Sequence, residues 1–422
     1  MTTTGRCSFL YSDHYPNQSF QILTFASYVA LDNKSGSKGN VQLKQLSKIE
    51  NREKQPMLLQ IQISFYKHSK RNLFCVLGSI LVISFITFAS PVANSQSAKF
   101  EFGILGDTDY SKKTEKELPK IISEMNNADL AFVVHIGDFE ADPRPYNRAP
   151  EKRSMPCVEE NYKRVRTVFQ TSKHPFLLTP GDNDWTDCHL LKAQKVDPLD
   201  ALTMVRKIFY PKGKSMGQNP MPVTSQASDP GYAKFVENLT WSKGGVTFAT
   251  VHLVGSNNNM GKKPEPSAEF TERTKANTEW VKKAFAKARA DNSLGLVLIT
   301  QANPAFEGSW KGRTLGRYFR PIASLGIKAP KKPEPKRYGY DEFHQVLLEE
   351  LATFKKPTLL MHGDNHYVRV DKPLFNPKTK GFVSNFTRVE TFGDPITGWI
   401  HVQVDPNDPD LFTFKFRQYK PN

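Results

Sequence analysis

The sequence is poor in cysteine, with four among 422 residues. So few cysteines exclude a small scaffold held by disulfides and an array of zinc ribbons. No segment recurs at a fixed period, which excludes a solenoid or a propeller. Acidic residues are outnumbered as well, since 58 Lys and Arg face 42 Asp and Glu and give a formal net charge of +16. This excess favours anionic partners, of which nucleic acid is one alternative.

The sequence contains one long apolar run, residues 73–89. Residues 73–89 carry no charge, follow three basic residues and precede a stretch of small and polar residues. This order is typical of a secretory signal peptide, and a membrane anchor is the alternative. We expect residues 57–98 to form the signal and residues 1–56 to be a poorly structured extension, untranslated if synthesis starts at Met57. The product is then secreted or periplasmic.

The cysteines agree with export. Cys157 and Cys188 are the two that follow the apolar run, and they lie 31 residues apart. An oxidising compartment would allow them to form a disulfide. Two unrelated buried thiols are the alternative.

Hydrophobic residues make up 38% of the chain and are arranged in short runs from residue 99 onward. Apolar runs with strand character alternate with segments of helical period, which predicts an α/β domain over residues 99–422. The expected strands are residues 100–105, 130–136, 175–179, 246–255, 294–300, 357–362, 399–404 and 411–416. The expected helices are residues 115–127, 270–290 and 341–354.

Four of these strands end in Gly-Asp. The acidic and imidazole residues that follow them are Asp107, Asp109, Asp138, Asp182, Asp184, Asp364 and His366. In α/β sheets the carboxyl edge of the strands is where ligands bind. Carboxylates gathered there would repel one another and raise each other's pKa unless a cation neutralised them. The pattern therefore predicts a divalent metal site, although a single Gly-Asp is more often an ordinary turn.

The order and spacing of these motifs resemble the calcineurin-like metallophosphoesterase superfamily, which includes the purple acid phosphatases. Its motifs run DxH, GD, GNH[DE], a late His and GHxH. The resemblance implies a two-sheet α/β/β/α sandwich with a binuclear metal site at the strand ends. It also implies phosphate ester hydrolysis by a metal-activated hydroxide, with Asp138 as the bridging ligand.

The chain departs from these motifs in one chemical direction. Asp109 stands where the family has His, Asp182 replaces Asn, Asn183 replaces His, Asp364 replaces the first His of GHxH, and Gln301 is the nearest polar residue to the late His. Asp107 and His366 match. The resemblance therefore implies a set of metal ligands, namely Asp107, Asp109, Asp138, Asp182, Gln301, Asp364 and His366. Because oxygen replaces nitrogen, we expect two hard divalent ions, manganese, magnesium or iron rather than zinc.

The family's proton donor is missing, because Asn183 can donate a hydrogen bond but cannot act as an acid. Either another imidazole such as His252 or His362 supplies the proton, or the leaving group needs none. His135 lies within an apolar strand and is predicted to be a packed core residue.

A basic segment follows the strand at 294–300. Residues 311–337 hold nine basic residues and one acid, among them Lys331, Lys332, Lys336 and Arg337. Such a segment could cover an anionic substrate, with a solvated insertion as the alternative. We therefore expect an exported phosphoesterase acting on a phosphorylated small molecule or nucleotide. The alternatives are a nuclease or nucleotide phosphodiesterase, or a non-catalytic metal-binding protein, and no obligate protein partner is evident.

Overall fold

The computed structural model describes residues 28–29, 43–44, 98–141, 157–190, 196–261, 265–306 and 338–420. The chain divides into two units, Met1–Ala93 and Asn94–Asn422. In the first unit the described residues form two short antiparallel strands, β1 (Tyr28–Val29) and β2 (Leu43–Lys44). The apolar run at 73–89 and the basic segment at 311–337 lie outside the described residues.

The second unit contains a five-stranded sheet in the order β16-β15-β3-β4-β5. Its strands are β3 (Phe100–Leu105), β4 (Val133–His135), β5 (Phe176–Leu178), β15 (Gly398–Val404) and β16 (Phe412–Gln418). β3, β4 and β5 run parallel, whereas β15 is antiparallel to both β3 and β16. β4 and β5 are buried throughout, as expected of parallel strands covered on both faces.

The second sheet has seven strands in the order β11-β14-β10-β9-β8-β7-β6. They are β6 (Thr224–Ser225), β7 (Leu239–Lys243), β8 (Val246–Thr250), β9 (Gly295–Ile299), β10 (Thr358–His362), β11 (Arg369–Asp371) and β14 (Phe386–Glu390). β8, β9, β10 and β14 are parallel, and the remaining pairs at the two edges are antiparallel. A small separate hairpin pairs β12 (Phe375–Asn376) with β13 (Gly381–Phe382).

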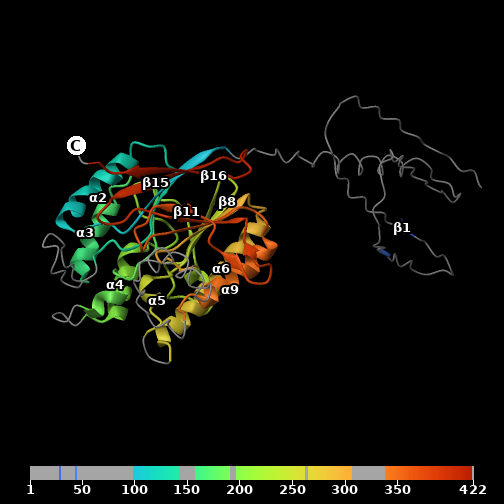
Figure 1. The fold of residues 1–422 in the computed structure, drawn as a ribbon, viewed down its shortest axis with the longest axis horizontal. Coiled ribbons are helices and arrows are strands. Elements are labelled where there is room, and N and C mark those ends of the chain that lie inside the picture. Colours follow the sequence, from blue (N-terminus) through green and yellow to red (C-terminus); the bar gives the residue numbers. More distant parts are fainter. Residues whose placement is uncertain are drawn as a thin grey trace, which may run out of the picture. The chain divides into compact units, whose positions relative to one another are not determined.

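Helices cover the outer face of each sheet (Figure 1). The first sheet is covered by α2 (Lys112–Met125), α3 (Glu159–Phe169) and α4 (Pro198–Phe209), and the second by α6 (Ala268–Ala290) and α9 (Asp341–Thr353). Local sequence explains where several of them begin. Ser111 forms a capping box with Thr114, and Asp197 caps α4 just before a proline, which suits the first turn of a helix. Shorter turns are η1 (Thr186–Leu190), η2 (Gln226–Ser228) and α5 (Gly255–Asn258).

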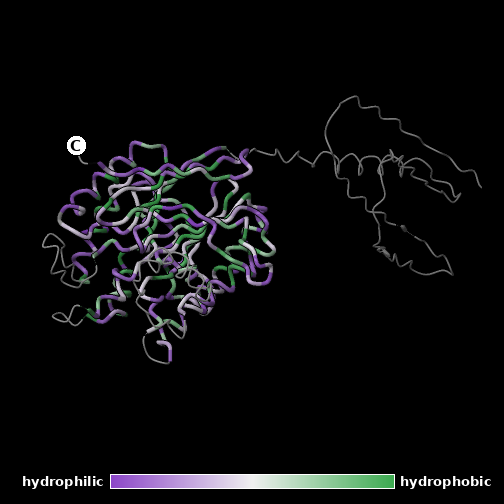
Figure 2. The backbone as a smooth tube through the Cα atoms, in the orientation of Figure 1, coloured by the Kyte–Doolittle hydropathy of each residue, from purple (hydrophilic) through white to green (hydrophobic). Residues whose placement is uncertain are grey.

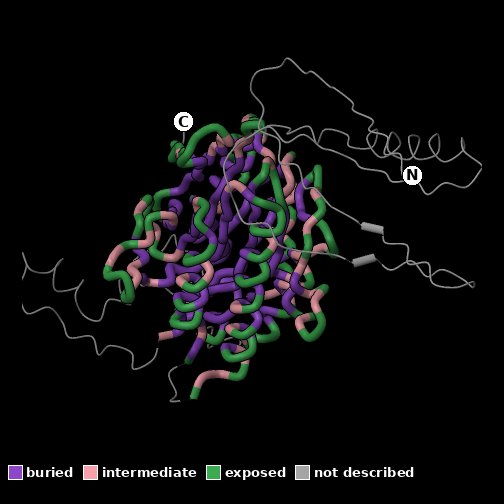
Figure 3. The backbone as a smooth tube through the Cα atoms, turned by 90° about the vertical axis from the view of Figure 1, so that its right-hand side faces the viewer, coloured by how far each residue is buried: buried purple, intermediate pink, exposed green. Residues whose placement is uncertain are grey.

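The two sheets pack face to face through an aromatic core. Phe102, Phe132 and Phe248 contact one another with ring centroids 5.0–5.4 Å apart, and Trp241 stacks on Phe248. Figure 2 shows hydrophobic residues concentrated along the central strands, and Figure 3 shows the same region as buried. Helix, sheet, sheet and helix therefore form the α/β/β/α sandwich that the resemblance implies.

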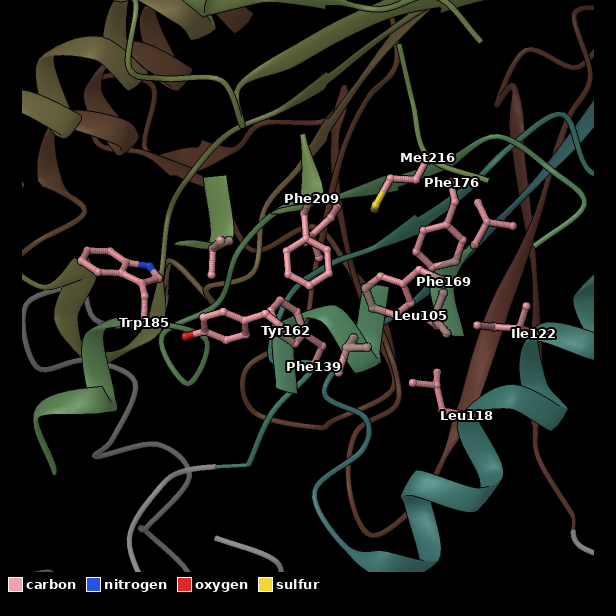
Figure 4. Close-up of a cluster of buried hydrophobic side chains, with 14 of the residues drawn as sticks. Leu105, Leu118, Ile122, Phe139, Tyr162, Phe169, Phe176, Trp185, Phe209 and Met216 are labelled. Carbon is pink, nitrogen blue, oxygen red and sulfur yellow. The ribbon is translucent and has the colours of Figure 1, made fainter. Parts of the chain in front are cut away.

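The helical side of the five-stranded sheet has its own core. Figure 4 shows Phe139, Phe169 and Phe209 packed together with Tyr162, and Trp185 lies beyond Tyr162 in the same cluster. His135 also belongs here: it is fully buried, and its ring lies 4.9 Å from that of Phe169. This placement agrees with the predicted core role of His135.

A disulfide holds the loop after β5 to the start of α3. Cys157 lies just before α3 and Cys188 lies in η1, and their Cα atoms are 5.8 Å apart. Both cysteines are buried. Among the described residues, none of the helices combines the length and the apolar character needed to cross a bilayer.

Candidate functional site

The acidic residues that follow the strands of one sheet meet residues of the other. Asp107 Oδ1 accepts a hydrogen bond from the Asp364 backbone N–H at 3.1 Å. Asp138 Oδ2 accepts one from Gln301 Nε2 at 3.0 Å, and Asp182 Oδ2 accepts one from Ser256 Oγ at 2.9 Å. The ends of β3, β4 and β5 therefore contact the segments after β10, β9 and β8. We call Asp107, Asp138, Asp182 and Asp364 the carboxylate cluster.

The backbone around this cluster is strained. Asp107, Asp138 and Asp364 have positive φ angles of 49°, 53° and 79°, and Asp109 and His366 have 66° and 63°. Residues other than glycine adopt this left-handed region rarely, and such strain is concentrated at functional sites. Several residues that the sequence singles out therefore share an unusual conformation as well as a location.

Burial and mutual repulsion raise the pKa values of three members of the cluster, Asp138, Asp182 and Asp364. Burial, and then the charges of Asp182 and Asp184, raise the pKa of Asp138 well above its usual range. Burial and the charge of Asp182 do the same for Asp364. Burial and the neighbouring Asp187 raise the pKa of Asp182 to about 6. The cluster therefore needs protons or a cation to neutralise it at neutral pH.

A frame of hydrogen bonds fixes Asp138. Tyr110 Oη donates to Asp138 Oδ2 at 3.1 Å, and Asn183 Nδ2 donates to Tyr110 Oη at 3.0 Å. The Asn183 backbone N–H donates to Asp138 Oδ1 at 3.1 Å. Asp184 accepts hydrogen bonds from the backbone N–H groups of Asp138, Phe139 and Gly181, which ties the two loops together.

Gln301 makes hydrogen bonds on both sides of its amide group. Its Nε2 donates to Asp138, and its Oε1 accepts from the Gly255 backbone N–H at 2.8 Å. The amide oxygen therefore accepts one backbone hydrogen bond and keeps a second lone pair, so coordination of a metal by Gln301 stays a prediction. Gln301 braces Asp138 against the loop after β8.

Asp109 and His366 lie at the site in distinct settings. Asp109 Oδ2 accepts from Arg164 Nη2 of α3 at 2.7 Å, so a guanidinium already neutralises this carboxylate. His366 Nε2 lies 3.4 Å from Asp107 Oδ1, and its Nδ1 lies 2.6 Å from the Asp394 carbonyl. Burial alone would lower the pKa of His366, but Asp107 outweighs it and raises this pKa to about 9. With a side-chain exposure of 25%, His366 also reaches solvent.

The two imidazoles expected to supply a proton are fully buried. His252 Nδ1 lies 2.8 Å from Glu237 Oε1, and Glu237 is also paired with Arg206. Burial lowers the pKa of His252, so it is neutral at pH 7 and poorly suited to donate a proton. His362 lies with Nδ1 2.8 Å from the Gly363 carbonyl and Nε2 4.0 Å from Glu390 Oε2. These contacts do not place either imidazole against the carboxylate cluster.

The carboxylate cluster suits a hard divalent cation in donor type. Asp107 Oδ2 is buried with no hydrogen-bond partner. A Cβ atom added to Gly255 would lie 2.6 Å from Asp182 Oδ2 and 2.7 Å from Asp364 Oδ1, so bare glycine backbone separates these carboxylates. Oxygen donors of this kind suit Mn²⁺ or Mg²⁺. Across the described ranges, however, no three His, Cys, Asp or Glu side chains are grouped as a set that could hold a metal ion.

Two residues at the site, Tyr110 and Ser256, belong to none of the motifs found in the sequence. Tyr110 follows the first Gly-Asp motif by three positions, and Ser256 follows β8. In the sequence, Ser256 is marked only by its neighbours, Gly255 before it and three asparagines after it. Such a run usually indicates a turn. The basic residues Lys331, Lys332, Lys336 and Arg337 lie outside the described residues.

Comparison with known proteins gives a distant likeness. No protein-family model matches the chain, and no curated protein matches it in sequence. Among solved structures the chain is similar to PhoD, at 13% identity over 75% of this chain and 65% of PhoD, with a TM-score of 0.44. It is also similar to a dimetal phosphatase from Danio rerio, at 10% identity over 76% of this chain and 96% of that one, with a TM-score of 0.43. Vacuolar protein sorting 29 from Cryptosporidium parvum aligns at 10% identity over 76% of this chain and 99% of that one, with a TM-score of 0.26. Similarity this distant carries no chemical argument, so function rests on the site itself.

Proposed function

We propose that the chain is a metal-dependent phosphoesterase whose centre is the carboxylate cluster. The observation that carries the proposal is the set of three hydrogen bonds that join Asp107, Asp138 and Asp182 to the second sheet. They bring buried carboxylates to one edge of both sheets, where burial raises the pKa of Asp138 and Asp182 and a divalent cation would relieve the repulsion. Asp107, Asp138, Asp182 and Asp364 would hold it, with Asp138 central, and the second of the two ions expected from the sequence is part of the same proposal.

A cation held there supplies Lewis-acid stabilisation of phosphoryl oxygens and activation of water. The protein's own residues do the rest. Tyr110 and Gln301 hold Asp138 in one orientation from opposite sheets. His366 Nε2 lies 3.4 Å from Asp107 Oδ1 and is partly open to solvent. In this proposal His366 binds the cation together with the cluster, as its match to the second His of GHxH implies.

The substrate class in this proposal is a phosphorylated small molecule or nucleotide. The basic excess of the chain supports an anionic substrate, and nucleic acid remains the alternative. Export to the periplasm or the medium is part of the same proposal, supported by the apolar run at 73–89 and by the disulfide.

The test is metal-restored turnover. The full chain is stripped with chelator, reloaded singly with Mn²⁺, Mg²⁺, Fe²⁺, Zn²⁺ or Ca²⁺, and assayed on para-nitrophenyl phosphate and bis-para-nitrophenyl phosphate. We expect Mn²⁺ or Mg²⁺ to restore turnover and Asp138→Asn to abolish it. Diester turnover above monoester turnover would favour the nuclease or phosphodiesterase alternative. Metal binding without turnover on either ester would contradict the enzymatic proposal and favour a binding protein.

A further inference from the structure

Four consecutive residues after β8 adopt the left-handed conformation. Ser256, Asn257, Asn258 and Asn259 have φ angles of 52°, 57°, 54° and 54°, and none of them is glycine. Left-handed helical backbone costs roughly 1–2 kcal/mol per L-residue and occurs mostly as single residues. We call residues 256–259 the left-handed turn. Its persistence requires surroundings that fix it.

Side chains and backbone from distant segments provide that fixation. Arg273 of α6, which is almost fully buried, donates to Asn258 Oδ1 at 2.5 Å and to the Asn258 carbonyl at 2.9 Å. Tyr340 Oη accepts from the Asn258 backbone N–H at 3.2 Å. The Gly339 backbone N–H donates to Asn257 Oδ1 at 2.9 Å, and the Gly339 carbonyl accepts from Asn258 Nδ2. The turn is therefore held from α6 and from the segment before α9.

The first residue of the turn reaches the carboxylate cluster. Ser256 Oγ lies 2.9 Å from Asp182 Oδ2 and 3.4 Å from Asp187 Oδ1, so its single proton is better placed for Asp182. The preceding Gly255 leaves the space between Asp182 and Asp364 without a side chain. A right-handed turn would direct Ser256 elsewhere, because the sign of φ sets the direction of the side chain. The left-handed turn thus places the Ser256 hydroxyl within hydrogen-bond distance of the Asp182 carboxylate.

We propose that Ser256 is a positioning residue, which holds Asp182 toward Asp364 so that the two carboxylates bind one divalent cation. This inference rests on the proposed metal site. Groups that orient metal ligands in this way are typically worth 10–100-fold in metal affinity. The alternative is that Ser256 matters only as part of the turn.

Ser256→Gly separates the two roles. Glycine adopts positive φ without steric cost, so it keeps the turn while removing the hydroxyl. Asn259→Gly is the matched control, because it makes the same change at the other end of the turn, where Asn259 Nδ2 contacts Glu269. Both variants of the full chain are stripped with chelator and titrated with Mn²⁺ by calorimetry, and their unfolding is measured in chelator.

We expect Ser256→Gly to raise the Kd for Mn²⁺ by about 10–100-fold while its metal-free stability stays within about 1 kcal/mol of wild type. Asn259→Gly is expected to bind Mn²⁺ like wild type. Equal Mn²⁺ affinity of wild type and Ser256→Gly would overturn the positioning role and leave the metal site intact. Absence of Mn²⁺ binding by wild type would instead overturn the metal site itself, and the inference with it.

Discussion

Reduction of the disulfide between Cys157 and Cys188 has a calculable effect on stability. The bond closes a loop of 31 residues between the start of α3 and η1. Restricting the unfolded chain by a loop of that length corresponds to about 3.7 kcal/mol at 25 °C in the chain-entropy treatment. We therefore expect the reduced protein to have a free energy of unfolding lower by about this amount.

The assay is equilibrium unfolding in urea, followed by tryptophan fluorescence with and without dithiothreitol. Trp185 is a suitable reporter, because it is fully buried and lies three residues before Cys188. Chelator is present in every sample, since a bound cation would add its own stabilisation. The double variant Cys157→Ala with Cys188→Ala is the control and should not respond to dithiothreitol.

A loss below about 1 kcal/mol on reduction of wild type would refute the reasoning. It would mean that the loop stays compact in the unfolded chain, or that the two thiols are not joined in the protein as made. Joined thiols would also support the export expected from the sequence.

Three further predictions concern the site and the core. Gly255→Ala should raise the Kd for Mn²⁺ at least 10-fold, measured by calorimetry, because the added methyl group would clash with both Asp182 and Asp364. Gly381→Ala is the control, since the nearest atom lies 4.0 Å from its added Cβ. Burial raises the pKa of Asp182 to about 6, so in chelator the ionisation of Asp182 lowers the free energy of unfolding as pH rises from 4 to 6. Over that range the free energy of unfolding of Asp182→Asn should rise relative to wild type by up to about 3 kcal/mol. Parallel plots of unfolding free energy against pH for the two proteins would contradict this. Burial lowers the pKa of His135 to about 3, so the free energy of unfolding should fall as pH drops from about 6.5 toward 3. In acid unfolding experiments the free energy of unfolding of His135→Gln should fall less steeply over this range than that of wild type.

The sequence was sufficient for most of the parallel strands and the long helices. Short buried runs such as residues 100–105 and 357–362 carry strong apolar signals, and both are strands. α3 was not predicted, because its polar sequence EENYKRVRTVF buries three residues and has no side-chain cap. The edge strand β11 was not predicted either, since it is three residues long and partly exposed.

Within the site, the pattern of Gly-Asp after strands located the carboxylate cluster because backbone topology brings strand ends together. The pattern could not assign hydrogen-bond partners, which depend on packing between distant segments. Coordination of a metal by Gln301 stays a prediction, and the sequence did not indicate its hydrogen bonds to Asp138 and Gly255. His252 was expected at the reacting centre and instead lies in a buried pair with Glu237.

The most direct test of the central claim is a crystal structure of the full chain soaked with Mn²⁺, with data collected at the manganese absorption edge. The account predicts an anomalous peak bonded to oxygens of the carboxylate cluster, with Asp138 among its ligands. A peak confined to other residues, or no peak at saturating Mn²⁺, would contradict the account.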